Sequence, residues 1–120
     1  MTARLSIRID LIGEAGACRV GPGKALLLEL IDQTGSISAA GRAMAMSYRR
    51  AWLLVESLNT SFRAPVVDAQ PGGRRGGGAR LTPFGRELVR RYRAIERAAA
   101  SAVEPDLGAI LSELKGADEP

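Results

Sequence analysis

The chain has 120 residues, of which 46% are hydrophobic and 25% are charged, and this composition predicts one small globular domain with a real core. It holds no histidine and one cysteine, Cys18, which excludes an intramolecular disulfide and disfavours a zinc finger or a histidine-based catalytic site. No apolar run approaches the ~20 residues that span a bilayer and no export signal is recognisable, so we expect a cytoplasmic protein without membrane contact, cofactor or metal.

The net charge of +4 is unevenly distributed along the sequence. Residues 1–35 hold four basic and four acidic groups, residues 36–97 hold twelve and four, and residues 98–120 hold one and five, which gives 0, +8 and −4. A basic central region suits a nucleic-acid partner. Because 15 of the 17 basic residues are arginine, compositional bias or simple solubility would explain the charge equally well. Charge alone therefore does not distinguish a nucleic-acid-binding surface from an ordinary soluble one.

The chain begins with a predicted strand. Apolar and polar residues alternate from Arg4 to Leu11, which is typical of a half-buried strand. A turn follows at Gly13–Gly16, and Cys18–Val20 fits a short return strand before Gly21–Gly23 closes the region.

A first helix is predicted from Lys24 onward. Apolar residues recur at Leu26, Leu27, Leu30 and Ile31 with helical spacing, Pro22 stands near the start, and Gly35 provides the stop. We expect this helix to pack behind the segment that follows it.

The segment from Ser36 to Asn59 predicts a helix-turn-helix. Ser36 is a candidate N-cap, and Ile37, Ala40 and Met44 recur on one face of a short helix behind it.

Ser47 is a second candidate N-cap, and the helix behind it buries Ala51, Val55 and Leu58. Trp52 adjoins this face, and we expect it to pack in the core rather than to contact DNA. The opposite side presents Tyr48, Arg49, Arg50, Leu53 and Ser57. A basic helix start exposed in this way favours entry into a DNA major groove.

Two short strands are predicted on either side of a glycine-rich loop. Val66–Ala69 and Ala79–Leu81 flank Gly72–Gly78, in which five of seven residues are glycine and the other two are Arg74 and Arg75. Such a loop lets the backbone approach a surface closely, which is typical of the wing of a winged helix. A flexible linker remains an alternative, and a phosphate loop is disfavoured because no Lys-Ser/Thr pair follows the glycines.

A long helix is predicted after the second strand, with Thr82 as N-cap and Pro83 in its first turn, running to Ala102. Its apolar stripe consists of Phe84, Leu88, Val89, Tyr92 and Ile95. The stripe needs a partner, which is either the first strand and helix of the same chain or the same helix of a second subunit. After Pro105, a short amphipathic helix is expected before an acidic end.

Three motifs together carry a family resemblance: Thr34–Ala40, Met46–Trp52, and the glycine-rich loop followed by Leu81-Thr82-Pro83-Phe84-Gly85. In this order they resemble the N-terminal DNA-binding domain of ModE-type molybdate-responsive regulators, and LysR-type regulators share parts of the pattern. The resemblance implies a winged helix that dimerises through the helix beginning at Pro83 and binds a palindromic operator. Full-length members continue into molybdate-binding repeats, so molybdate sensing does not carry over to these residues.

The sequence therefore predicts a mainly α fold with a small β-sheet, a winged helix-turn-helix with a long C-terminal dimerisation helix. Residues 1–103 form the DNA-binding domain and residues 104–120 a helical tail. The predicted contacts to double-stranded DNA are Ser36, Ser38, Ser47, Tyr48, Arg49, Arg50, Leu53, Arg74, Arg75 and Arg80. The predicted homodimer contacts are Phe84, Leu88, Tyr92 and Ile95.

The leading function is a dimeric, sequence-specific transcriptional regulator, with molybdenum-related genes as possible targets. The alternative is an interaction module that pairs with a full-length regulator and binds DNA poorly, for which Leu53 and Leu54 on the second helix give some support. An enzyme is disfavoured because the carboxylates have no histidine, metal-ligand spacing or nucleophile pattern around them.

Overall fold

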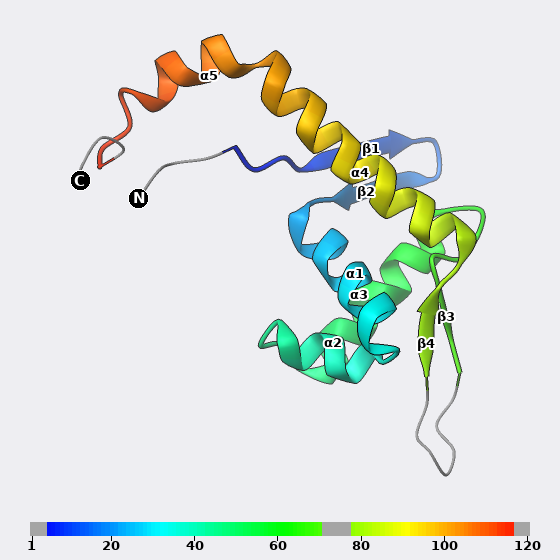
Figure 1. Ribbon diagram of the computed structural model, residues 1–120. Helices are drawn as coiled ribbons and strands as arrows, with labels where there is room; N and C mark the ends of the chain where they lie inside the picture. The colour runs from blue at the N-terminus through cyan, green and yellow to red at the C-terminus, as the bar shows by residue number, and fades with distance from the viewer. Residues whose placement is uncertain (1–4, 71–77, 117–120) are drawn as a thin grey trace.

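A computed structural model describes residues 5–70 and 78–116 of the chain (Figure 1). Its elements are, in order, β1 (Ile9–Gly13), β2 (Gly16–Val20), α1 (Pro22–Thr34), α2 (Ile37–Ala43), α3 (Tyr48–Ser61), β3 (Val67–Ala69), β4 (Ala79–Leu81), α4 (Pro83–Ala102) and α5 (Glu104–Leu111). In Figure 1, α1, α2 and α3 gather at the centre, the β3–β4 hairpin extends to one side, and α4 crosses in front of β1 and β2.

The β structure corrects the predicted fold class. The described residues form two separate antiparallel hairpins instead of one small sheet: β1 pairs with β2, with Ile9 opposite Val20, and β3 pairs with β4, with Val67 opposite Leu81. The first strand begins at Ile9, later than the alternation from Arg4 suggested. With only two strands each, both hairpins depend on packing against helices for their stability.

The helix boundaries agree with the capping residues expected from the sequence. The hydroxyls of Ser36, Ser47 and Thr82 accept hydrogen bonds from the third amide of α2, α3 and α4. Gly35 ends α1 with a φ of 71°, a left-handed conformation that glycine adopts without steric cost. Pro83 stands in the first turn of α4, where its missing amide removes no helical hydrogen bond.

The main core lies where α1, α2 and α3 meet the β3–β4 hairpin. Its buried residues are Leu27, Leu28, Ile31, Ile37, Ala40, Ala51, Val55, Leu58, Val66, Val67, Ala79 and Leu81. Phe62 and Phe84 close one side of it with ring centroids 5.2 Å apart and a tilted geometry that aromatic pairs favour. On α1, α2 and α3, the helical spacing of the buried residues aligns the apolar faces of the three helices.

Asn59, near the end of α3, fixes the position of β3. Its side-chain oxygen accepts hydrogen bonds from the amides of Val66 (2.7 Å) and Val67 (3.0 Å), and its side-chain nitrogen donates to the Val67 carbonyl at 3.1 Å. On the other strand, the Ala79 amide donates to the carbonyl of Gly35 at 2.9 Å. Both strands of the hairpin are thus attached to helix ends.

The start of α4 is attached to the same hairpin. The Thr82 hydroxyl donates to the carbonyl of Pro65 at 2.6 Å, and the Thr82 amide donates to that of Val66 at 3.0 Å. Gly85 is buried against Val66, and a Cβ at position 85 would overlap the Val66 carbonyl oxygen. The helix approaches the strand this closely only because residue 85 has no side chain.

A second buried cluster joins α4 to the N-terminal hairpin through Tyr92, Val20 and Ala25. The Tyr92 hydroxyl donates to the carbonyl of Ile7 at 2.6 Å, and burial, together with the nearby Glu96, raises the pKa of Tyr92. Tyr92 was expected to contact a second subunit. With 2% of its surface exposed, it instead fills the core of its own chain.

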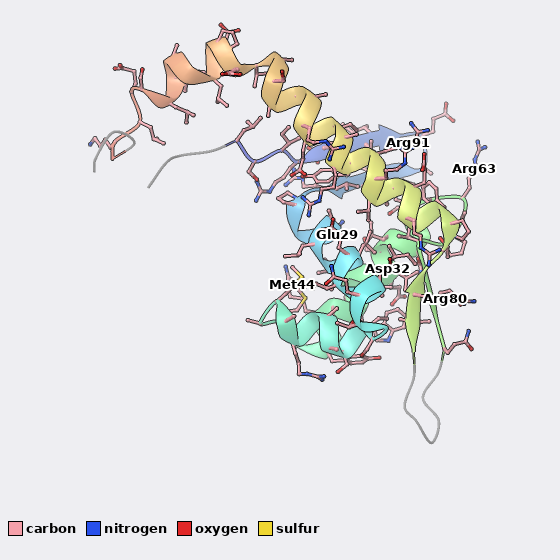
Figure 2. The ribbon with its side chains drawn as sticks, in the orientation of Figure 1. Glu29, Asp32, Met44, Arg63, Arg80 and Arg91 are labelled. Atoms are coloured by element: carbon pink, nitrogen blue, oxygen red, sulfur yellow. The ribbon has the colours of Figure 1, made fainter. Side chains whose placement is uncertain are left out.

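Ion pairs join α4 to α1. The Arg93 guanidinium contacts Glu29 at 2.7 Å and Glu96 at 2.8 Å, while Arg86 lies 3.6 Å from Asp32. Figure 2 shows Glu29 and Asp32 on α1. The two carboxylates raise the pKa of Arg93 above its already high ordinary value, so Arg93 stays charged and holds α4 against α1.

The C-terminal part of α4 and all of α5 form an arm that extends away from the core (Figure 1). No residue of α5 is buried. The radius of gyration is 17.0 Å, whereas a compact domain of this length has about 14 Å, so the molecule is extended. Between residues 5 and 70 and between 78 and 116, no helix is both long and apolar enough to cross a membrane.

Candidate nucleic-acid interface

The turn between α2 and α3 sets the direction of α3. Ala45 takes a φ of 55°, and the Met46 amide donates to the carbonyl of Gly41 at 3.0 Å. Gly41 is buried, and a Cβ there would lie 3.1 Å from the Cβ of Ala51. The two helices therefore touch at their smallest residues, which fixes the start of α3 against α2.

Helical spacing divides α3 into three sides. Ala51, Val55 and Leu58 are buried, as predicted from the sequence. At 100° per residue, Arg49 and Leu53 lie directly opposite this buried side. The first turn of α3 therefore presents side chains to solvent in two directions, outward and toward the β3–β4 hairpin.

The outward side carries the exposed residues that were predicted to contact DNA. Leu53 has 51% of its surface exposed, and Arg49 and Arg50 are exposed beside it. Tyr48, which is 55% exposed, stands on the side of α3 that faces the hairpin. Among the residues that the structure describes, no carboxylate pairs with Arg49 or Arg50. Both guanidinium groups are thus available to an anionic partner.

The three serines predicted at the site have structural partners. Ser36 caps α2 through the Ala39 amide at 3.0 Å, and Ser47 caps α3 through the Arg50 amide at 3.1 Å. Ser38 accepts a hydrogen bond from Arg42 at 2.8 Å. Each hydroxyl acts as an acceptor in these contacts, so its hydrogen can still be donated to another group.

A groove of about 860 Å³ separates α3 from the β3–β4 hairpin. Its lining includes Ser36, Ile37, Ser38, Tyr48, Trp52, Val55, Asn59, Pro65, Val67, Asp68, Ala69, Gln70, Gly78, Ala79 and Thr82. Aliphatic side chains from α2, α3 and both strands form much of it, and two aromatic residues of α3 stand along one wall. The hydrogen bonds of Asn59 set the spacing between the two walls.

Trp52 corrects one expectation of the sequence analysis. It was predicted to pack in the core, but 44% of its surface is exposed and it lines the groove. The physical reason is its position one residue after Ala51, which turns its side chain 100° away from the centre of the buried side. Trp52 and Asn59 are the residues of this site that sequence reasoning missed.

The hairpin adds one described arginine. Arg80 on β4 lies 3.7 Å from Asp68 on β3, with 76% of its side chain exposed (Figure 2). Arg74 and Arg75, also predicted to contact DNA, lie outside the residues that the structure describes. Their proposed role stays a prediction from the sequence.

The other predicted dimer contacts lie along α4. Phe84 and Leu88 are partly buried against the main core of their own chain, and Ile95, farther along, has 45% of its surface exposed. Of the four predicted residues, Ile95 presents the largest free apolar surface to a partner.

The described residues contain no group of three or more histidine, cysteine, aspartate or glutamate side chains that could hold a metal ion. What the site offers is a basic helix start, an apolar groove and an exposed hairpin. Helix α2, helix α3 and the two strands together carry Arg42, Arg49, Arg50 and Arg80 against Glu56 and Asp68, which is four positive charges against two negative. This arrangement suits the binding of an extended anion better than it suits catalysis.

No protein-family model matches the sequence. The chain is similar to the molybdenum-pterin-binding protein MopB of Rhodobacter capsulatus, with 48% identity over 87 residues that cover 72% of this chain and 32% of MopB. It is 37% identical to the molybdenum transport protein ModE of Azotobacter vinelandii over 119 residues, 98% of this chain and 43% of ModE. The DNA-binding transcriptional dual regulator ModE of Escherichia coli K12 is 35% identical over 71 residues, 59% of this chain and 27% of that protein.

These relatives correct the family assignment. The chain spans between about a quarter and under half of the length of the proteins that it matches. Its similarity is highest, among these three, to a protein named for molybdenum-pterin binding, so the assignment to the N-terminal DNA-binding domain of ModE-type or LysR-type regulators does not stand. The winged helix-turn-helix is likewise replaced by a description of what is observed, a mainly helical chain with two separate hairpins.

Proposed function

We propose that this chain binds double-stranded DNA through the first turns of α3 and acts in the regulation of molybdenum-related genes. The observation that carries the proposal is the exposed face of α3, on which Arg49 and Arg50 have no acidic partner among the described residues while the opposite face is firmly buried. A helix held rigidly on one side and basic at its exposed start has the geometry for a major groove.

The names of the relatives support both parts of this proposal. One of them is described as a DNA-binding transcriptional dual regulator, and two others are named for molybdenum transport or molybdenum-pterin binding. Because this chain covers less than half of each, their activities enter here only as a proposal.

The proposal predicts a strong dependence of DNA affinity on salt. Each phosphate contact contributes about −0.9 to the slope of log affinity against log salt, so we expect a slope of about −3 or steeper from the arginines of α2, α3 and the hairpin. Fluorescence anisotropy with a labelled pool of random duplexes measures it. Arg91→Ala on α4, where Arg91 pairs with Glu87 at 2.7 Å, removes an equal charge away from the interface and should leave the slope unchanged. Absence of duplex binding at low salt would exclude the proposal.

The arm supports a second proposal, that two copies of the chain associate through α4 and α5. Ile95, Val103, Ile110 and Leu114 each expose more than a third of their surface along this arm. An amphipathic helix with no buried residue gains little stability on its own, and burial against a second copy provides what its own chain does not. The same surface serves the alternative function, an interaction module that pairs with a longer relative.

Association through the arm predicts that Ile110→Glu yields a monomer. Ile110 is 67% exposed, so the change leaves the fold of one chain intact but places a charge in the proposed contact. Sedimentation equilibrium should show a dimer for the unmodified protein and a monomer for the variant. Ile12→Glu, at a residue 82% exposed on the N-terminal hairpin, is the matched control and tests whether any exposed isoleucine would do the same. A monomeric unmodified protein would contradict the second proposal and leave DNA binding open.

A further inference from the structure

The groove between α3 and the β3–β4 hairpin has a feature that major-groove binding by Arg49 and Leu53 does not use. Tyr48 and Trp52 stand four residues apart, one helical turn, and both line the wall that faces the hairpin. Each of these two large aromatic residues has about half of its surface exposed beside an apolar floor, and a contiguous apolar patch of this kind marks an interaction site.

Resting on the proposed function, we infer that this groove holds one sugar–phosphate strand of the bound duplex, with Trp52 packed against a deoxyribose. The direction of the groove carries the inference. Trp52 lies between the buried side of α3 and its outward side, so when the outward side faces base edges, the strand that borders the major groove passes along Trp52.

The lining of the groove offers apolar surface for a sugar, and the cation Arg80 lies beside it. The floor includes the uncharged Ile37, Val55 and Ala79, which suit a sugar ring. Arg80 on the hairpin lies beside the groove, where a phosphate would emerge, whereas Arg50 lies on the opposite flank of α3 and does not border it. Asp68, the acidic residue in the described lining, lies 3.7 Å from Arg80, so Arg80 would turn from Asp68 to contact a phosphate. A sugar contact fixes the protein on the duplex without reading sequence.

Trp52 is the only tryptophan in the sequence, so its fluorescence reports this contact directly. In the full chain, saturation with duplex should reduce acrylamide quenching of Trp52 to about half, because a sugar covers the exposed part of the ring. Trp52→Ala should weaken binding by about tenfold for preferred and unrelated duplexes alike, since all sequences present the same sugar. Trp52→Phe should restore most of the affinity, and Ile12→Ala on the N-terminal hairpin is the control that should change neither measurement.

The outcomes separate this inference from the function on which it rests. A duplex that binds but leaves Trp52 equally accessible to acrylamide overturns the inference and leaves DNA binding intact, and so does a folded Trp52→Ala variant with unchanged affinity. Tighter binding to a single strand than to a duplex overturns it as well, because it indicates base stacking on the ring. No binding of duplex at low salt overturns both. If Trp52→Ala does not fold, the quenching measurement on the unmodified chain still shows whether bound duplex covers Trp52.

Discussion

Replacing Arg49 by alanine is expected to weaken binding to the preferred duplex by about 1 to 3 kcal/mol and to flatten the ranking of sequences, because a bidentate contact to a guanine edge discriminates by that amount. Arg50→Ala is expected to weaken all sequences alike and to reduce the salt slope by about 0.9. The structure distinguishes the two arginines, since Arg49 lies opposite the buried side of α3 and Arg50 lies on its flank. Affinities for a panel of single-base variants of a selected duplex measure both effects.

Arg49→Lys is the matched control for charge. Lysine keeps the positive charge but lacks the planar fork that contacts two acceptors at once, so discrimination should fall while the salt slope is retained. If the alanine variants of Arg49 and Arg50 both keep the original ranking of sequences, neither residue reads a base and the proposed orientation of α3 is wrong.

Replacing Gly85 by alanine is expected to destabilise the fold by about 3 kcal/mol, at the upper end of the usual cost of overpacking. The added Cβ would overlap the carbonyl oxygen of Val66, which also accepts the hydrogen bond from Thr82, and would lie 3.3 Å from the Cβ of Leu81. A backbone oxygen held in this way has little freedom to move. Urea unfolding followed by far-ultraviolet circular dichroism gives the change in free energy of unfolding.

Gly23→Ala separates a steric effect from a general effect of glycine substitution. Gly23 lies in the first turn of α1, and beyond its own turn of helix nothing lies within 4 Å of an added Cβ, so alanine there should be neutral or stabilising by up to about 1 kcal/mol. A Gly85→Ala protein as stable as the unmodified one would show that α4 and Val66 are not held as closely as described.

Local sequence signals predicted the helix boundaries well. Serine or threonine N-caps and Gly35 act within one turn of the chain, so their effect can be inferred from neighbouring residues alone. The buried side of α3 was predicted for the same reason, because the spacing of Ala51, Val55 and Leu58 needs no knowledge of the rest of the molecule.

Features that depend on distant parts of the chain were not predicted. The ion pair of Arg93 with Glu29 and the hydrogen bond of Tyr92 to Ile7 join residues 64 and 85 positions apart, and no local pattern indicates either. Trp52 was wrongly predicted to be buried because the prediction considered its hydrophobicity and not its angular position around the helix. The separation of the two hairpins likewise follows from which helices cover them, which periodicity does not reveal.

The side chain that holds β3 against α3 has no charge. An amide neither titrates in the physiological range nor gains or loses much when ions screen electrostatic fields, so the three hydrogen bonds of Asn59 persist in conditions that alter contacts to phosphate. Under the proposed function, rising ionic strength should therefore dissociate bound DNA at salt concentrations that leave the width of the groove unchanged. On that proposal, a salt titration would measure the affinity for nucleic acid while the shape of the binding surface stays constant.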